Sequence, residues 1–292
     1  IQTERKNSGM DETVLLDAGD TLYSYATDFF YGYNEKLVQP IYQAMAAMEY
    51  DAITLGNHEF DYGWDYIEYQ LKKSGLYEKT TVSNLLYEED DSQVLAPSVV
   101  VEKEILMSDG RLQTVRVGIV GATRQSLSTK RQRYSGLFYG TDIYGAVKKE
   151  AERLKKEGVD VVVALIHGGI GIKDSTQTVS PGGRLATVSQ IDAVVTSHTH
   201  EEFPTNQNLY KAYTSVDEKN GLIYGKPVVA VGSYAQNLGV INLEITYDGN
   251  GNLVVGNGNS KLLAVEESTK ESETILNINK RYERYLEKKL DT

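Results

Sequence analysis

The feature that most constrains this chain is the placement of its four histidines, each of which follows an apolar run rich in β-branched residues. The histidines and the runs before them are His58 after 52–55, His167 after 159–166, and His198 and His200 after 191–196. A further run, 13–16, leads into Asp17-Ala-Gly-Asp20. One histidine after a strand is more often a hydrogen-bonded structural residue than a ligand. Four at equivalent places favour a single metal site at the carboxyl edge of a sheet.

The densest polar stretch of the chain is Thr54-Leu-Gly-Asn-His-Glu-Phe-Asp61. After a β-prone run, Gly56 lets the backbone turn, and an amide, an imidazole and two carboxylates then follow within a few residues. Such a concentration of polar side chains is typical of a loop, where binding and catalytic groups are common. Alternatively, Asn57 to Glu59 could cap the next helix, with Asp61 in its first turn. This stretch alone leaves both interpretations open, and the other histidines favour the metal site.

Composition limits the partners and the ligand chemistry. The net charge of −11 argues against a nucleic-acid polymer as substrate, whereas a mononucleotide phosphate can be neutralised by metal ions. Without any cysteine, a metal must be held by His, Asp and Asn, which suits Zn²⁺, Mn²⁺ or Fe²⁺. No apolar run is long enough to span a membrane.

The remaining pattern predicts an α/β chain without a linker midway. Helices are expected at 31–48, where Pro40 marks a start or a break, at 64–73, from Asp142 to 158 and from 271 onward. The last has an apolar stripe of Ile275, Ile278, Tyr282 and Tyr285. Strands are expected at 98–106 and 113–120 as a hairpin around Asp109-Gly110, and at 226–232, 238–247 and 253–255 as consecutive antiparallel strands. Asn84 is expected to hold a loop rather than a metal.

Four motifs in this order resemble those of the calcineurin-like metallophosphoesterases. They are Asp17-Ala-Gly-Asp20, Gly56-Asn-His-Glu59, His167-Gly-Gly169 and His198-Thr-His200. Gly-Asn-His-Glu-Phe-Asp is similar to the 5′-nucleotidase superfamily. Within it, stretches such as His200-Glu-Glu-Phe-Pro204 and Asn237-Leu-Gly-Val-Ile-Asn-Leu243 are most similar to the 2′,3′-cyclic-nucleotide 2′-phosphodiesterase/3′-nucleotidase branch. The resemblance extends from about residue 14 into the 240s.

The resemblance implies a four-layer α-β-β-α sandwich, with two mixed sheets flanked by helices. It implies a catalytic domain over 1–265 and, over 266–292, a helix that links it to a nucleoside-binding domain outside this chain. It also implies a nucleotide or small phosphate-ester substrate and an extracellular, cell-wall-associated or periplasmic location.

The resemblance further assigns a role to each site residue. Asp20 would bridge two divalent ions, with Asn57, His167 and His198 completing one site and His200 contributing to the other. His58 would lie beside the phosphate as a catalytic group, with Asp61 fixing its tautomer. Arg124 could approach the phosphate, although a surface position is the simpler expectation.

The chain departs from the family pattern in two places. The family begins with an Asp-x-His that supplies two ligands to the first metal, and none precedes Asp20 here. Either the strand that carries it is not represented in this chain, which we favour, or the site binds one metal. Ser197 also replaces the usual glycine before His198. A catalytically impaired nucleotide-binding module, or a phosphatase for sulfur- or sugar-linked phosphates, therefore stays an alternative.

Overall fold

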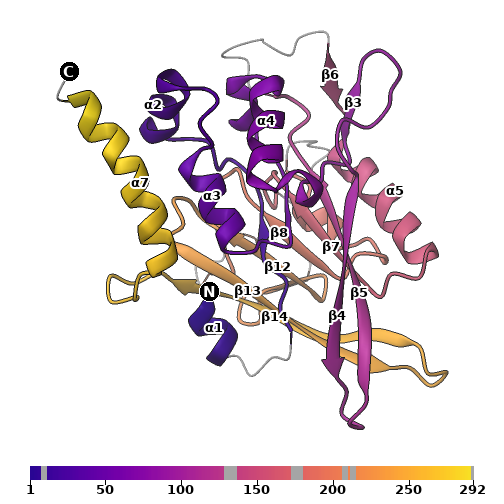
Figure 1. Cartoon of the computed structure of the whole chain (residues 1–292). Helices are drawn as coiled ribbons and strands as arrows, with labels where there is room; N and C mark the ends of the chain where they lie inside the picture. Colours follow the sequence, from indigo (N-terminus) through magenta and orange to yellow (C-terminus); the bar gives the residue numbers. More distant parts are fainter. Residues whose placement is uncertain (8–11, 128–136, 172–179, 206–209, 211–214, 291–292) are drawn as a thin grey trace.

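An eight-stranded mixed sheet forms the centre of the fold (Figure 1), with the strand order β10-β11-β12-β8-β7-β5-β4 and with β9 paired to β12. We describe a computed structural model that covers residues 1–7, 12–127, 137–171, 180–205, 210 and 215–290. The strands of this sheet are β4 (Ser98–Leu106), β5 (Leu112–Ala122), β7 (Val161–Ile166), β8 (Ala193–Thr196), β9 (Glu202–Phe203), β10 (Val216–Asp217), β11 (Leu222–Ile223) and β12 (Lys226–Val231).

Strands β5, β7, β8 and β12 run parallel, so their carboxyl ends share one edge of the sheet. All six residues of β7 are buried, as expected for a central parallel strand that is covered on both faces. The hairpin of β4 and β5 confirms the expected antiparallel pair around Asp109-Gly110.

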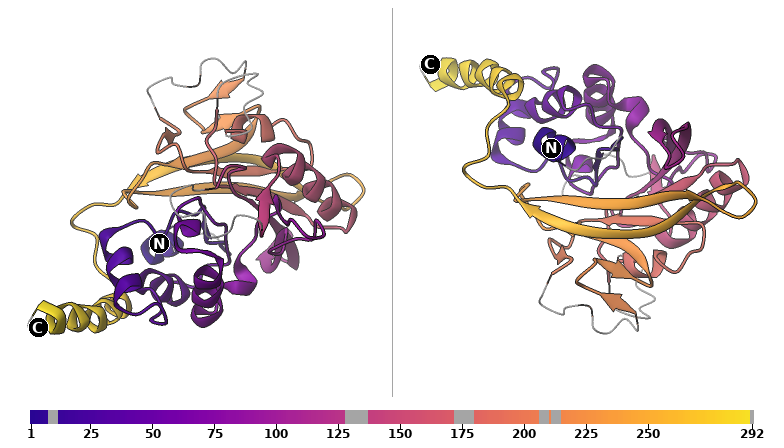
Figure 2. Two further views of the ribbon diagram at one scale, coloured as in Figure 1. Left: turned by 90° about the horizontal axis from the view of Figure 1, so that it is seen from above. Right: turned by 90° about the horizontal axis from the view of Figure 1, so that it is seen from below.

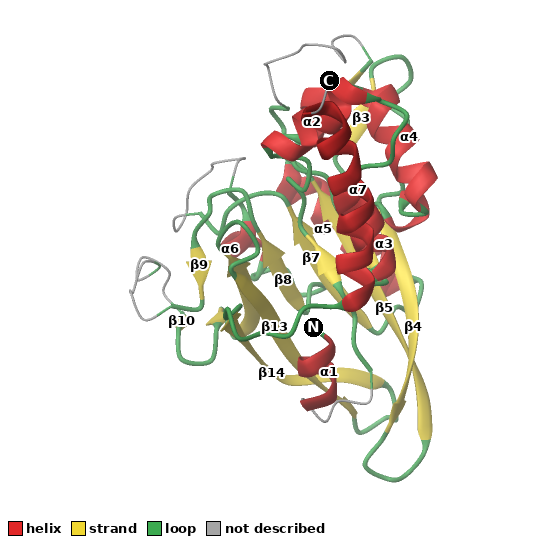
Figure 3. Cartoon of the chain, turned by 60° about the vertical axis from the view of Figure 1, so that its left-hand side comes forward, coloured by secondary structure: helices red, strands yellow, loops and turns green. Residues whose placement is uncertain are grey.

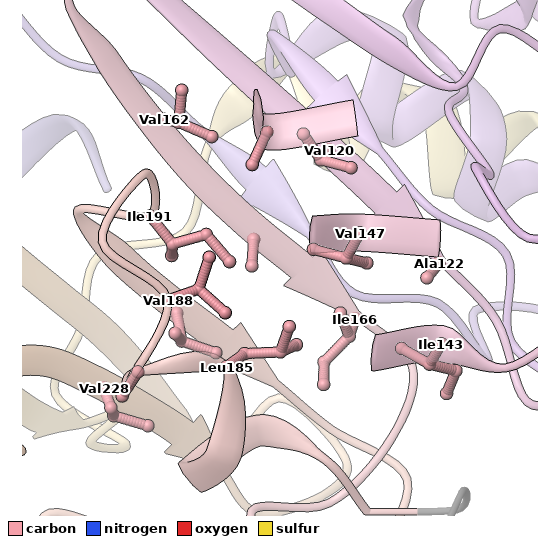
Figure 4. Close-up of a cluster of buried hydrophobic side chains, with 14 of the residues drawn as sticks. Val120, Ala122, Ile143, Val147, Val162, Ile166, Leu185, Val188, Ile191 and Val228 are labelled. Carbon is pink, nitrogen blue, oxygen red and sulfur yellow. The ribbon is translucent and has the colours of Figure 1, made fainter. Parts of the chain in front are cut away.

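Two helices cover one face of the sheet, α5 (Ile143–Lys156) and the short α6 (Gly182–Leu185). The carboxylate of Asp142 caps α5 as expected, since it accepts a hydrogen bond of 2.7 Å from the amide of Gly145. Val147 on α5, Leu185 on α6 and Ile166 on β7 meet in a fully buried apolar cluster (Figure 4). Burial of such side chains is the main force that holds this layer on the sheet.

The opposite face of the sheet is covered by two separate pairs of strands. β1 (Leu16–Asp17) and β2 (Ala52–Ile53) pair in parallel, and β13 (Asn237–Tyr247) and β14 (Leu253–Ala264) form a long antiparallel hairpin. Both pairs pack on the sheet through one apolar cluster that includes Ala52, Ile119, Leu165 and Ile241.

The expectation that 226–232 and 238–247 form consecutive antiparallel strands is wrong. β12 pairs in parallel with β8 inside the large sheet, and β13 leaves that sheet to pair with β14. The reason is burial: four of the six β12 residues are buried, whereas the residues of β13 are only partly buried or exposed. β12 is therefore a central strand, and β13 belongs to the covering layer.

The outer layer on this side contains α3 (Pro40–Ala47), α4 (Trp64–Ser74) and the 3-10 turns η1 (Glu59–Tyr62) and η2 (Tyr77–Lys79). The small sheet of β3 (Leu85–Tyr87) and β6 (Phe138–Gly140) packs beside them. The expected helix over 31–48 is two helices, α2 (Tyr25–Tyr33) and α3, and Pro40 is the first residue of the second. Helix α4 ends at Gly75, whose φ of 77° is the left-handed conformation that glycine favours.

Helix α7 (Glu273–Leu290) lies beside α2 and α3 (Figures 2 and 3). Its expected apolar stripe is confirmed, because Ile275, Ile278, Tyr282 and Tyr285 pack around Phe30 of α2. The hydroxyl of Tyr282 also donates a hydrogen bond to the carbonyl of Val38. A short helix, α1 (Gln2–Asn7), precedes these elements.

The layers are helix, sheet, strand pairs and helix, which agrees with the expected α-β-β-α sandwich of two sheets flanked by helices. In the part of the chain that the structure describes, the second sheet consists of the two separate strand pairs. No described helix has the length and apolar character that crossing a membrane requires. The division into a domain over 1–265 and a linking helix over 266–292 stays a prediction.

Candidate metal centre

The candidate site lies where the carboxyl ends of two layers meet. In the large sheet, Ala122, Ile166 and Thr196 form the last paired row of β5, β7 and β8, and His167 directly follows that row on β7. From the other layer, Asp20 and Asn57 follow β1 and β2. Parallel strands therefore deliver polar side chains from three segments to one edge.

The Asp20 loop approaches the Asn57 loop so closely that both need glycine. Gly19 has a φ of 86°, and a Cβ built on it would lie 2.3 Å from the amide nitrogen of Gly56. A Cβ on Gly56 would lie 2.2 Å from Asp20 Oδ1. Asp20 itself adopts a φ of 61°, an uncommon conformation for a residue with a side chain. The two glycines thus bring the Asp20 carboxylate against the Asn57 loop.

Glu59 joins these two loops. Its carboxylate accepts hydrogen bonds from the amides of Gly56 at 2.7 Å, Asp20 at 2.9 Å and Leu22 at 2.9 Å, and only 1% of the residue is exposed. Burial raises the pKa of Glu59, as does the charge of Asp20, while the amide hydrogen bonds oppose the shift. Sequence reasoning considered Glu59 only as part of a possible helix cap, although its position three residues after Gly56 was the available signal.

His167 is oriented for metal binding by the other layer. Its Nδ1 lies 2.7 Å from the carbonyl oxygen of Ala18, which can only accept, so Nδ1 carries the proton. The hydroxyl of Ser197 lies 3.0 Å from the same nitrogen and donates to the same carbonyl at 2.8 Å. In the neutral imidazole Nε2 therefore presents a lone pair, the arrangement that a metal-binding histidine requires. The serine that replaces the family's glycine thus supports the ligand.

Asp20, His167 and His198 offer ligand atoms that all lie within 4.8 Å of one another. His167 Nε2 is 3.0 Å from Asp20 Oδ2. In the described structure, however, neither Nε2 nor the buried Oδ1 of Asn57 has an aligned hydrogen-bond partner. Buried polar atoms are rarely left without a hydrogen-bond partner. A divalent cation would satisfy both atoms, and the mixed nitrogen and oxygen donors suit a borderline metal. The residues present fit the implied metal.

The electrostatics of the three groups are coupled. Burial alone would raise the pKa of Asp20, but the adjacent His167, when protonated, outweighs burial and lowers that pKa. Burial likewise opposes protonation of His167, yet Asp20 raises its pKa. Burial and the neighbouring His167 charge lower the pKa of His198 to about 4. His198 is therefore neutral near pH 7 and available as a ligand.

His58 lies next to this cluster and is held from three sides. Its amide donates to Asp20 Oδ1 at 2.8 Å, and its Nδ1 is 2.8 Å from Asp61 Oδ2. The ring of Tyr23 stacks on its imidazole with centroids 4.0 Å apart and planes 24° apart. Nε2 is then the ring nitrogen that Asp61 does not contact. Sequence reasoning paired His58 with Asp61 but missed Tyr23.

Two further predicted residues lie at the edge of the site. His200 is exposed, has a φ of 58°, and its ring centroid is 6.5 Å from that of Tyr234. It lies outside the group of three ligands above, so its role at a second metal stays a prediction. Arg124 is only partly exposed, and its buried Nε has no partner among the described residues. Its charge contributes to the lowered pKa of His198, so Arg124 is close to the cluster.

Asn84 has the loop-holding role expected of it. Its side-chain amide donates to the carbonyls of Thr123 at 2.8 Å and Thr141 at 2.9 Å, and its Oδ1 accepts from the amide of Thr123 at 2.9 Å. The residue is fully buried, and these bonds tie the segment after β5 to the segment before α5.

This fold and this cluster of carboxylate, imidazole and amide side chains suit a hydrolase that binds divalent ions. The model of the calcineurin-like phosphoesterase family matches residues 4–202, and the chain belongs to that family. The chain is 29% identical over 270 residues to a 2′,3′-cyclic-nucleotide 2′-phosphodiesterase/3′-nucleotidase of Haemophilus influenzae, covering 89% of this chain and 39% of the relative. It is 30% identical over 300 residues to the trifunctional nucleotide phosphoesterase protein YfkN of Bacillus subtilis, covering 95% of this chain and 19% of the relative.

Solved structures agree with the fold. The calcineurin-like phosphoesterase YfkN from Bacillus subtilis matches with a TM-score of 0.89 and 25% identity, over 100% of this chain and 89% of that one. The sulfate thiohydrolase SoxB of Thermus thermophilus matches with a TM-score of 0.71 and 16% identity, over 96% of this chain and 44% of that one, and shows the fold alone. The chain thus spans less than half the length of the two curated relatives named above.

Proposed function

We propose that this chain hydrolyses nucleotide phosphate esters, namely 2′,3′-cyclic nucleotides and 3′- or 5′-mononucleotides, with metal-activated water. The observation that carries the proposal is the group of Asp20, His167 and His198, together with the buried Oδ1 of Asn57, which has no partner among the described residues and belongs to the loop that contacts Asp20. The choice of nucleotides rests on the relatives named above. We further propose an extracellular, cell-wall-associated or periplasmic location and a partner domain that binds the nucleoside.

Asp20, Asn57, His167 and His198 would hold one divalent ion, and Asp20 and His200 would contribute to a second, with Zn, Mn or Fe as candidates. When bound, the ions supply an activated water and stabilise charge on the phosphoryl oxygens. Ala18 keeps His167 in the tautomer that presents Nε2. Glu59 keeps the Asp20 loop at its short distance from Asn57.

The other residues act on the substrate. His58, oriented by Asp61 through Nδ1, presents Nε2 to the leaving oxygen, and in its cationic form it gives that oxygen the Nε2 proton and becomes neutral. Arg124 brings a positive charge to the site and a buried donor without a partner among the described residues, which a phosphoryl oxygen can satisfy. These charges offset the repulsion that a chain of net charge −11 exerts on an anionic substrate.

The test measures bound metal by elemental analysis and hydrolysis of 2′,3′-cyclic AMP, 3′-AMP, 5′-AMP and glycerol phosphate. We expect near two metals per chain and turnover of the nucleotides, with a large but incomplete loss of turnover in His58→Ala. Hydrolysis of glycerol phosphate alone would refute the nucleotide assignment. Substrate binding without any hydrolysis by a metal-loaded chain would identify an impaired binding module instead.

A further inference from the structure

The ring of Tyr23 covers one face of the His58 imidazole, and nothing in the family motifs accounts for it. The two centroids are 4.0 Å apart, the planes are 24° apart, and Tyr23 is 51% exposed. An aromatic side chain with half its surface in water gains only part of the burial free energy of a core aromatic residue. Its position therefore needs another explanation than packing of the core.

The backbone on both sides of Tyr23 is fixed. Leu22 is completely buried, and its amide donates to Glu59 at 2.9 Å. Ser24 caps α2 by accepting a hydrogen bond of 3.1 Å from the amide of Thr27. With Leu22 anchored in the core and Ser24 committed to the helix, Tyr23 is presented outward at a defined place. The stack is thus built into the same Glu59-centred network that holds Asp20.

We propose that Tyr23 is a positioning residue that fixes the plane of the His58 ring for proton transfer. Asp61 holds one edge of the imidazole through Nδ1, which leaves rotation about that contact possible. Stacking on Tyr23 removes this freedom and keeps Nε2 aimed at one point, which lowers the cost of reaching the reactive geometry. This inference rests on the proposed role of His58.

The residue type also follows from this role. Aromatic rings favour offset stacking at short centroid distances, and the ring alone, without its hydroxyl, supplies the contact. Phenylalanine at this position is therefore sufficient, whereas leucine or alanine is not. Tyr25, two residues away and 96% exposed, offers a matched control that lacks the stack.

The experiment compares Tyr23→Ala, Tyr23→Phe and Tyr25→Ala in the metal-loaded chain, with a nitrophenyl phosphodiester and an alkyl phosphodiester as probes. We expect Tyr23→Ala to lower kcat about three- to ten-fold on both probes with little change in KM. Tyr23→Phe and Tyr25→Ala should match the wild type. In a His58→Ala background, Tyr23→Ala should have no further effect, because the interaction it removes is already absent.

A readout independent of activity is the nuclear magnetic resonance signal of the His58 ring protons. In Tyr23→Ala these signals should move downfield, since the shielding by the stacked ring is lost, and Tyr23→Phe should restore them. A kcat effect that persists in the His58→Ala background would overturn the proposal. So would a KM effect confined to the nitrophenyl probe, which would identify Tyr23 as a substrate-stacking residue. If the wild type hydrolyses neither the probes nor the nucleotides named above, the proposed function fails, while the ring-proton shifts still show whether Tyr23 stacks on His58.

Discussion

Replacement of Glu59 by glutamine tests how the metal centre is assembled. In the wild type, Oε2 accepts from Gly56 and Asp20, and Oε1 accepts from Leu22. Glutamine keeps the shape but has one acceptor oxygen. In its better orientation the amide oxygen serves Gly56 and Asp20, and the amide group then faces the Leu22 N–H, so that two buried donors oppose each other.

The expected loss of stability follows from the hydrogen bonds that the substitution removes. One hydrogen bond to a charged acceptor is lost, about 1.5–3 kcal/mol, and buried donors are left unsatisfied, about 1–3 kcal/mol. Part of this loss of stability is offset, because the neutral side chain removes a buried charge beside Asp20. We expect a net loss of about 2–4 kcal/mol in the free energy of unfolding. Because the loop loses its anchor at Leu22, two residues after Asp20, metal affinity should also fall.

The assay is urea unfolding of the metal-free chain, followed by titration with Zn²⁺ or Mn²⁺. The matched control is Glu102→Gln on β4, whose side chain is 66% exposed, and it should change the stability by less than about 0.5 kcal/mol. A Glu59→Gln variant with wild-type stability and wild-type metal affinity would refute the role of Glu59 in holding the Asp20 and Asn57 loops together.

Three further predictions concern other parts of the molecule. Asn57→Ala should reduce metal content, measured by elemental analysis, yet leave the metal-free chain within about 1 kcal/mol of wild-type stability, since it removes a buried oxygen without a described partner; a large loss of stability would contradict this. His198 has a pKa lowered from 6.5 to about 4, so its contribution to stability is complete above pH 6.5 and is lost as the pH falls to about 4. His198→Gln should therefore flatten the pH dependence of unfolding of the metal-free chain in that window, and an unchanged slope would contradict the shift. Asp142→Ala removes the cap of α5 and should cost about 1 kcal/mol in thermal or urea unfolding without changing turnover; a loss of activity would contradict its purely structural role.

Local sequence determined several elements that the structure contains. The apolar run before His167 forms β7, Asp109-Gly110 forms the turn of the hairpin, and Asp142 caps α5. Each depends on residues within a few positions of one another. The apolar runs before His167 and His198 likewise predict that both histidines follow a strand. The two strands are neighbours in the parallel part of the sheet.

Other features depend on contacts between distant segments and could not be predicted locally. The helical pattern over 31–48 is interrupted at Gln39, which makes two contacts with α4. Its side-chain Nε2 donates to Tyr66 Oη at 2.6 Å, and its backbone N–H donates to Gln70 Oε1 at 2.7 Å. The role of Glu59 requires Leu22, 37 residues away. The stack of Tyr23 on His58 likewise joins two loops that no periodicity relates.

The hairpin of β4 and β5 has a consequence for the tolerance of this protein to change. The chemistry lies at the Ala122 end of β5, and the strand runs 11 residues back to the Asp109-Gly110 turn. At about 3.3 Å per residue, that turn is roughly 35 Å from the metal centre. The φ of 82° at Gly110 favours glycine there, but a Cβ on it would meet no atom within 4 Å, and Leu106 and Leu112 beside the turn are exposed. Inserted residues, an affinity tag or a fluorescent label can therefore be attached at this turn without disturbing turnover. The turn can accordingly vary in length and sequence, whereas the edge of the sheet that carries the candidate metal centre cannot.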